Sequence, residues 1–153
     1  MQEPYHFLPL EEARQLLREH FGINGEMKIL AGEVDANFKV KTAENNFLFK
    51  ISRAGTDEEF LLFQENILKY LEQREISFGI YEDGEEEQIL EFPLETPLLF
   101  QDLKQQDFVR TQRSNGEKIY LRLLSWVEGK LWSDLRYHDE KLLFSLGSAA
   151  GAL

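Results

Sequence analysis

The stretch LAGEVDANFKVKTAENNFLFKISRAG, residues Leu30–Gly55, places a single lysine, Lys50, inside an apolar run. Lysine is rarely buried without a partner, so its presence in a strand of this composition needs an explanation. Because side chains alternate along a strand, Lys50 shares one face with Leu48 and Ser52, while the neighbouring apolar residues share the other. The stretch therefore predicts a sheet with an apolar face and a face on which a cation meets a polar partner.

Short runs of β-type residues around Lys50 predict three antiparallel strands near residues 27–31, 36–42 and 46–52. The Asn45-Asn46 pair closes the second hairpin, since asparagine tolerates positive φ. The next segment predicts a helix with Thr56 as its cap and Glu59 completing a capping box. The residues expected on the inner face of that helix are Phe60, Leu61, Gln64, Ile67, Leu68 and Leu71.

The flanking segments complete an α+β fold: a mainly antiparallel, five- or six-stranded sheet with one long packed helix, an N-terminal helix and a truncated C-terminal helix. The N-terminal helix has Pro9 at its first position and Gly22 at its exit. Further strands are expected near 97–101, 107–112 and 117–125, with a turn at Asn115-Gly116. Residues 72–95 give no clear pattern, and Pro93 argues against a central strand there. Helical spacing continues to Leu153 without a cap, as expected of a chain cut through a helix.

The composition bounds the function. The chain has 153 residues, no cysteine and a net charge of −11, which suggests one domain without disulfides. Such an acidic chain repels phosphate backbones, so we expect no nucleic-acid partner. No apolar run has the length of a membrane span and no signal-peptide pattern is present, so we expect no membrane partner and a cytoplasmic location. The acidic segment Tyr81–Gln88 is interpreted as a solvated loop.

The ordered set LAGEVDANFKVKT, NNFLFKIS, EFLLFQENILKYL, YLRLLSWVEGKLW and LLFSLGSAAGAL resembles the N-terminal lobe of the aminoglycoside phosphotransferase family. Within that family it is most similar to the hydroxylysine-kinase-like branch, some bacterial members of which are fused to a class III aminotransferase. The resemblance covers nearly the whole chain. It implies a kinase-like nucleotide-binding lobe over residues 1–128, with the hinge exit and the start of a C-terminal lobe over 129–153.

The resemblance also implies roles for particular residues. The segment from Gly32 to Asn37 becomes the phosphate-covering loop, with backbone N–H groups expected to face the nucleotide in place of the Glu33 and Asp35 side chains. Lys50 becomes the contact to the α- and β-phosphates. The residues that the resemblance assigns to nucleotide binding are Gly32, Val34, Asn37, Leu48, Lys50, Gln64, Glu65, Leu124, Ser125 and Val127.

Within that set, Leu48 packs on the adenine, with Leu124 behind it, and the Ser125 carbonyl and the Val127 N–H contact the adenine edge. The family normally offers the lysine a glutamate from the helix. Here that place falls on Gln64, with Glu65 next to it, and the sequence leaves open which of the two supports the lysine.

The catalytic aspartate and the magnesium ligands of the family belong to the C-terminal lobe. None of His6, His20 and His138 is followed by Gly-Asp, so we expect no catalytic residue and no metal ligand in this chain. The resemblance implies ATP and Mg²⁺ as cofactors, with the magnesium held by the missing lobe. The chain alone is expected to be inactive.

The function implied is the ATP-binding lobe of a small-molecule kinase that phosphorylates a hydroxyl of an amino-alcohol or hydroxylated amine. Two alternatives stay open: a non-catalytic docking or regulatory module of a larger enzyme, and an adaptor recognised through the acidic segment 81–88. Lys50 could also simply extend to solvent from an edge strand. Besides nucleotide and substrate, we expect a homodimer formed through WVEGKLW and the C-terminal helix, surfaces that a missing lobe would cover. It would be either a symmetric dimer or one that exchanges the terminal helix, and the alternative is a terminal helix that folds back on its own sheet.

Overall fold

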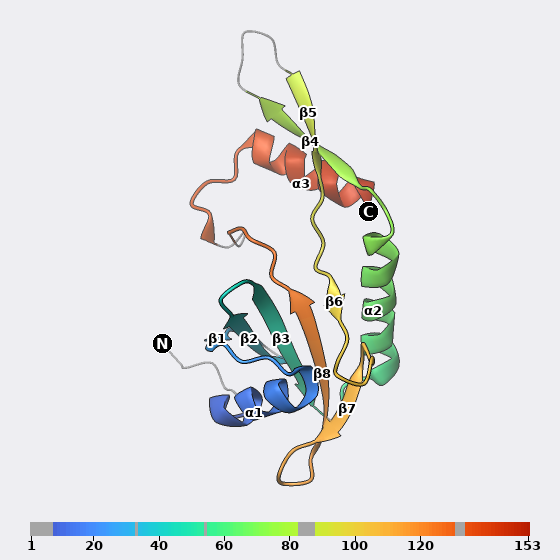
Figure 1. The fold of residues 1–153 in the computed structure, drawn as a ribbon. Helices are drawn as coiled ribbons and strands as arrows, with labels where there is room; N and C mark the ends of the chain where they lie inside the picture. The colour runs from blue at the N-terminus through green and yellow to red at the C-terminus, as the bar shows by residue number, and fades with distance from the viewer. Residues whose placement is uncertain (1–7, 33, 54, 83–87, 131–133) are drawn as a thin grey trace. The chain divides into compact units, whose positions relative to one another are not determined.

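The computed structural model describes residues 8–32, 34–53, 55–82, 88–130 and 134–153. The chain divides into two compact units, which we call the sheet unit (Met1–Leu68 and Pro97–Trp126) and the hairpin unit (Lys69–Thr96 and Val127–Leu153). The elements run, in chain order, α1 (Leu10–Phe21), β1 (Glu26–Leu30), β2 (Ala36–Lys41), β3 (Asn46–Arg53), α2 (Glu58–Glu72), β4 (Ser77–Glu82), β5 (Gln88–Pro93), β6 (Leu99–Phe100), β7 (Val109–Gln112), β8 (Lys118–Ser125) and α3 (Glu140–Ala152) (Figure 1).

The sheet unit is built on six antiparallel strands in the order β1-β2-β3-β8-β6, with β7 also paired to β8. The predicted α+β class, the antiparallel sheet and the strand positions are thus confirmed. Gly116, at φ +83°, provides the left-handed turn residue expected between β7 and β8. The long pairing of β3 with β8 puts Lys50 in the middle of the sheet, so it does not lie on an edge strand.

One face of this sheet forms the hydrophobic core. Its buried residues include Phe38, Phe49 and Leu123, and α1 covers them with Leu17 and Phe21. The ring of Phe21 meets that of Phe49 edge to face, with centroids 5.9 Å apart. Aromatic pairs in this arrangement add to the stability gained from area burial alone. The alternation predicted for β3 is confirmed, because its apolar residues at odd positions are all buried.

Two details at the ends of α1 show what the sequence pattern did and did not specify. Gly22 ends the helix in a left-handed conformation, φ 69°, and its N–H donates to the Arg18 carbonyl, as predicted. Pro9 occupies the cap position instead of the first helical position, because its ψ of 144° is extended and the helix begins at Leu10.

The sequence assigned the cap and the inner face of α2 incorrectly in part. The capping side chain is Asp57 and not Thr56, since the Asp57 carboxylate accepts from the N–H groups of Glu59 and Phe60 at 3.0 and 3.3 Å. The buried residues of α2 are Leu61 and Glu65, whereas Phe60 and Ile67 are exposed. The buried face of α2 is therefore centred on Leu61 and Glu65, and it is rotated about the helix axis relative to the face that the apolar pattern predicted.

The hairpin unit contains structure that the sequence analysis left without assignment. β4 and β5 pair as a two-stranded antiparallel sheet from Ser77 opposite Pro93, so Pro93 lies at the end of an edge strand, as its chemistry requires. α3 packs on β4, where the Gly79 N–H donates to Ser148 Oγ at 2.8 Å. Asp139 caps α3 through the Leu142 N–H at 2.8 Å. The centre of the predicted acidic loop, residues 83–87, lies outside the described residues.

Among the described residues, no helix combines the length and the apolar character that crossing a bilayer requires.

Candidate functional site

Lys50 lies on the sheet face opposite the core. In β3 it stands between Asn37 of β2 and Arg122 of β8, which are its direct cross-strand neighbours. Directly opposed residues of antiparallel strands point to the same face, so Asn37, Lys50 and Arg122 form a row across the sheet. The Lys50 side chain is 25% exposed and that of Arg122 only 4% exposed.

A carboxylate from the segment before β2 neutralises this row. Asp35 Oδ2 lies 3.2 Å from Lys50 Nζ and also 3.2 Å from Arg122 Nη2. The sequence analysis expected the backbone of this segment, and not the Asp35 side chain, to face the phosphate position. The structure instead places the Asp35 carboxylate against the lysine, because two opposed cations on neighbouring strands require a negative charge between them.

Arg122 connects this row to α2. Its Nη1 donates to Gln64 Oε1 at 2.9 Å, and its Nη2 makes a longer contact of 3.4 Å to Ser52 Oγ. Burial lowers the pKa of the Arg122 guanidinium below its usual value, and the nearby charges of Asp35 and Glu65 act in the opposite direction. Guanidinium nevertheless stays charged at neutral pH, since its pKa is so far above 7.

The sequence left open whether Gln64 or Glu65 supports Lys50, and the structure shows that both of them act on Arg122. Gln64 contacts Arg122, and Glu65 is buried at 2% exposure with its charge acting on the same guanidinium. Both residues of α2 thus act on an arginine that the sequence analysis did not single out. A signal was present: Arg122 interrupts the apolar run YLRLLSW as Lys50 interrupts its own, and pairing the two strands brings the two interruptions together.

The predicted phosphate-covering loop folds tightly around Gly32. A Cβ added at Gly32 would overlap the Asp35 carbonyl oxygen and the Asn37 amide nitrogen, so only glycine fits there. The Asn37 side chain donates to that same Asp35 carbonyl at 3.4 Å. Val34 is exposed, and Glu33 lies outside the described residues. Glycine at position 32 allows this close packing. The packing in turn holds the backbone of Asp35, from which the carboxylate extends.

The residues assigned to the adenine lie further along the same face. Leu48 of β3 is the direct cross-strand neighbour of Leu124 of β8, so the two leucines share a face with Lys50. Ser125 already uses its N–H and hydroxyl, because its N–H donates to the Leu98 carbonyl and its Oγ accepts from the Leu98 N–H, both at 2.8 Å. The Ser125 carbonyl is the group that the prediction assigned to the nucleotide. Val127 belongs to the hairpin unit, so its place in this site stays a prediction.

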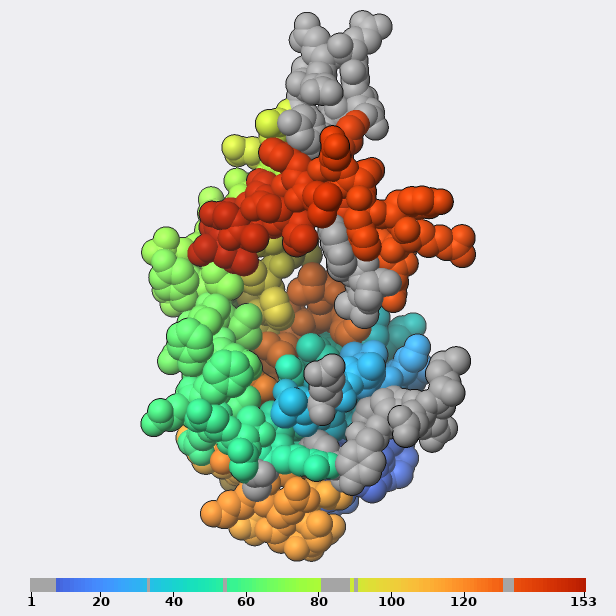
Figure 2. Space-filling view, turned by 180° about the vertical axis from the view of Figure 1, so that it is seen from behind, coloured from blue at the N-terminus to red at the C-terminus, as the bar shows by residue number. Residues whose placement is uncertain are grey.

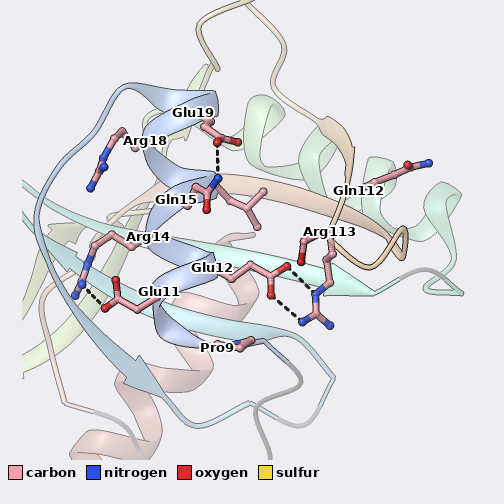
Figure 3. Close-up of a pocket in the computed structure, with 11 residues that line it drawn as sticks. Pro9, Glu11, Glu12, Arg14, Gln15, Arg18, Glu19, Gln112 and Arg113 are labelled. Atoms are coloured by element: carbon pink, nitrogen blue, oxygen red, sulfur yellow. Dashed lines mark hydrogen bonds and ion pairs between the residues drawn. The ribbon is translucent and has the colours of Figure 1, made fainter.

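A separate groove of about 880 Å³ runs along α1 and the β7–β8 turn, and it contains none of the predicted site residues. Its main polar feature is Arg113, which donates to both carboxylate oxygens of Glu12 at 2.8 and 3.1 Å (Figure 3). The hydrogen bond from Arg113 lowers the pKa of Glu12. Because Arg113 also pairs with Glu117 at 2.9 Å, this cluster is occupied in joining α1 to the turn.

No magnesium ligand is assigned in this chain. Among the residues that the structure describes, no group of three or more histidine, aspartate or glutamate side chains is arranged to hold a metal ion. Lys50 and Arg122 are two cations that share the Asp35 carboxylate, and a pair of cations suits an anion and not a divalent cation.

Comparison with known proteins identifies the fold. No protein-family model and no curated protein sequence matches the chain. Among solved structures, the amicoumacin kinase hAmiN, in complex with AMP-PNP, Ca²⁺ and Ami, is similar with a TM-score of 0.57 and 12% identity, over 80% of this chain and 32% of that chain. The spectinomycin phosphotransferase APH(9)-Ia, in complex with ADP and spectinomycin, is similar with a TM-score of 0.51 and 12% identity, over 87% and 34%.

At this identity the likeness shows the fold alone. The sheet and helices match the kinase-like N-terminal lobe of these phosphotransferases, which confirms the predicted fold class. The chain spans about a third of the length of both solved structures.

Proposed function

We propose that this chain is the nucleotide-binding lobe of a small-molecule kinase, with the phosphates on the charged sheet face. The observation that carries the proposal is the cation row: Lys50 and Arg122 stand side by side in the middle of the sheet and share one anionic oxygen, that of Asp35. The two solved structures of similar fold are those of kinases crystallised with AMP-PNP and ADP, which supports nucleotide as the ligand.

The proposed roles follow the geometry of that face. Lys50 contacts the phosphates, Leu48 and Leu124 flank the adenine, and Ser125 offers its carbonyl to the adenine edge. Gly32 allows the close packing of the segment up to Asn37, whose backbone N–H groups reach the phosphates once the Asp35 carboxylate is displaced. Gln64 and Glu65 support Arg122 from α2, and Val34 and Val127 complete the set as predicted from the family resemblance.

The finer assignments rest on the resemblance. The phosphoryl acceptor is an amino-alcohol or a hydroxylated amine, and the chain belongs with the hydroxylysine-kinase-like branch. The enzyme is cytoplasmic, and its catalytic aspartate and magnesium ligands lie in a C-terminal lobe. The lobe division at residues 128 and 129 belongs to the same proposal. Magnesium, when bound there, would neutralise phosphate charge during the transfer.

The experiment is an ATP-consumption assay on the longest product of the gene, screened against amino alcohols and hydroxylated amines. Lys50→Met should abolish consumption, since it removes the cation at the phosphates. Lys118→Met is the matched control, because it removes an exposed lysine at the start of β8 and should leave consumption unchanged. Consumption that survives Lys50→Met, or that is absent with every acceptor, would reject the kinase.

A non-catalytic module remains the second candidate, and one observation favours it: Asp35 already neutralises the lysine that would hold phosphate. The coding sequence after Leu153 separates the two. A His-Gly-Asp segment with a later asparagine and aspartate favours the kinase, and their absence favours the module.

The proposed homodimer concerns the hairpin unit. α3 exposes Leu143 and Leu146, Leu153 directly after it is exposed as well, and the space beside Gly147 and Gly151 is open. Burial of such apolar surface stabilises by roughly 25 cal/mol per Å². Sedimentation velocity at tens of micromolar should show a dimer that Leu146→Glu converts to a monomer, and a monomeric wild type would remove the proposal.

A further inference from the structure

The charged sheet face contains an unusual pair. Lys50 and Arg122 are opposite each other in the β3–β8 ladder, where like charges destabilise the pairing of strands. Arg122 cannot turn to solvent, because its side chain is 4% exposed and Gln64 Oε1 holds one of its nitrogens at 2.9 Å. The two cations therefore stay close together, and an anion between them is needed to offset their repulsion.

The anion in place is a single oxygen. Asp35 Oδ2 lies 3.2 Å from Lys50 Nζ and 3.2 Å from Arg122 Nη2, so one oxyanion position is shared by an ammonium and a guanidinium. These are the two cations that proteins use to bind phosphate oxygens. The Asp35 carboxylate thus stands where a phosphate oxygen would bind, and it comes from the same chain.

The other neighbours of the pair leave this position to Asp35. Gln64 and Ser52 are neutral acceptors, so they orient Arg122 without cancelling its charge. Glu65, on the buried side of α2, adds a second negative charge near Arg122. Among the described residues, the charges of Lys50, Arg122, Asp35 and Glu65 sum to zero. With the Asp35 carboxylate withdrawn, the other three of these groups carry one net positive charge.

Asp35 lies outside the two strands that hold the cations. It precedes β2, and its backbone carbonyl lies against Gly32 and accepts from the Asn37 side chain at 3.4 Å, so its carboxylate is the part that can move. Seen in space filling, the light-blue residues leading into β2 and the green α2 lie on the same side of the sheet unit (Figure 2), which agrees with their meeting at Arg122. Rotation about the side-chain bonds of Asp35 would move the carboxylate without moving β3 or β8, the strands that hold the cations.

We propose that Lys50 and Arg122 form a two-cation phosphate site, and that Asp35 is an internal competitor that an incoming phosphate must displace. The inference rests on the proposed function for the identity of the anion as a nucleotide phosphate, while the two-cation site itself rests on geometry. Arg122 is then a second phosphate-binding residue beside Lys50, and Asp35 sets the affinity. No bond is made or broken: one carboxylate leaves two cations, and a phosphate oxygen takes its position.

The test measures binding of inorganic pyrophosphate and of ADP to the full chain by isothermal titration. Asp35→Asn keeps the size of the side chain and removes its charge, so it should bind pyrophosphate about tenfold more tightly than wild type. Glu58→Gln is the matched control: it makes the same change in net charge at the exposed Arg110 pair and should change affinity less than twofold. The double variant Asp35→Asn/Arg122→Met should lose the gain.

The variants could also differ in stability, because Asp35→Asn leaves two cations facing each other. Thermal unfolding keeps the proposal testable in that case: pyrophosphate should raise the midpoint of Asp35→Asn more than that of wild type or Glu58→Gln, since a ligand stabilises the state that binds it. Equal pyrophosphate affinity and equal stabilisation in Asp35→Asn and Glu58→Gln would overturn the inference, whatever ADP does.

ADP separates this inference from the proposed function. If Asp35→Asn gains affinity for pyrophosphate and binds ADP more tightly still, both stand. If it gains for pyrophosphate but ADP binds no better than pyrophosphate, the two-cation site stands and the nucleotide function is contradicted. If Asp35→Asn gains for neither probe while wild type binds ADP through Lys50, the function stands and the competitor role of Asp35 is wrong.

Discussion

The two faces of one sheet use opposite means of holding their side chains. On the face toward α1, neighbouring residues of β3 are buried hydrocarbons such as Phe49 and Ile51, and their packing needs no particular partner. On the other face, Lys50 and Arg122 are held in place by named acceptors, Asp35 and Gln64. Apolar burial is non-directional, whereas a buried charge requires a placed counter-charge. The first face therefore stabilises the fold by packing alone, whereas the second holds charges whose partner a ligand can replace.

The largest difference in stability should come from substituting, one at a time, two adjacent residues that lie on opposite faces of the sheet. Phe49→Ala removes a fully buried ring that meets Phe21 and Phe38, and it should lower the free energy of unfolding by about 3–5 kcal/mol. Lys50→Met, one residue along, should lower it by less than about 1 kcal/mol, since Asp35 keeps Arg122 as a partner. Urea unfolding measures both, and comparable losses would break the contrast between the faces.

Arg122 tests whether the charged face is also structural. Arg122→Ala leaves the buried charge of Glu65 and the Asp35 carboxylate without the guanidinium, and removing one member of a buried ion pair costs about 3 kcal/mol. Arg110→Ala is the control, because that arginine and its acceptor Glu58 are both exposed, and it should change little. If urea unfolding finds the two alanine variants equally stable, Arg122 does not hold this face together.

The ion pair of Glu12 and Arg113, on the α1 side of the sheet, should contribute to the stability of the fold and not to ligand binding. Arg113 lowers the pKa of Glu12 below its usual 4.5, so the pair stabilises the fold above pH 4.5 and loses its contribution as the pH falls through the lowered pKa. Glu12→Gln should therefore cost about 1 kcal/mol at pH 7 and progressively less below pH 4.5. Glu11→Gln, on the same helix but exposed, should show a smaller and flatter difference. A Glu12→Gln cost that stays constant from pH 7 to pH 3 would refute the linkage.

The sequence predicted the apolar half of the fold better than the charged half. Strand alternation around Lys50, the exit at Gly22 and the turn at Gly116 are local consequences of side-chain size and backbone freedom, and all three were found. The inner face of α2 was partly wrong because Glu65 is buried while Phe60 is exposed. Hydrophobic periodicity has no way to indicate a buried carboxylate, which depends on a cation from another strand.

The candidate site shows the same limit. Lys50 was found from one anomalous position in a strand, but its neighbour Arg122 lies 72 residues later and becomes a neighbour only through the β3–β8 register. Asp35 was noticed as an odd residue in a phosphate loop, and its role required the distance to both cations. The strands β4 and β5 were missed because edge strands around a proline and an acidic run lack the apolar signal of central strands.

The most direct test of the account is a titration of the ¹⁵N-labelled chain with ADP, followed by amide chemical shifts. We predict weak binding, with a Kd in the millimolar range or about −4 kcal/mol, because Asp35 competes with the phosphates and the magnesium ligands are proposed to lie in a C-terminal lobe. The shifted amides should lie in residues 32–37, 48–52 and 122–125, and Lys50→Met should abolish the shifts. Shifts centred on the groove beside Glu12 and Arg113, or shifts in residues 32–37 and 122–125 that persist in Lys50→Met, would contradict it.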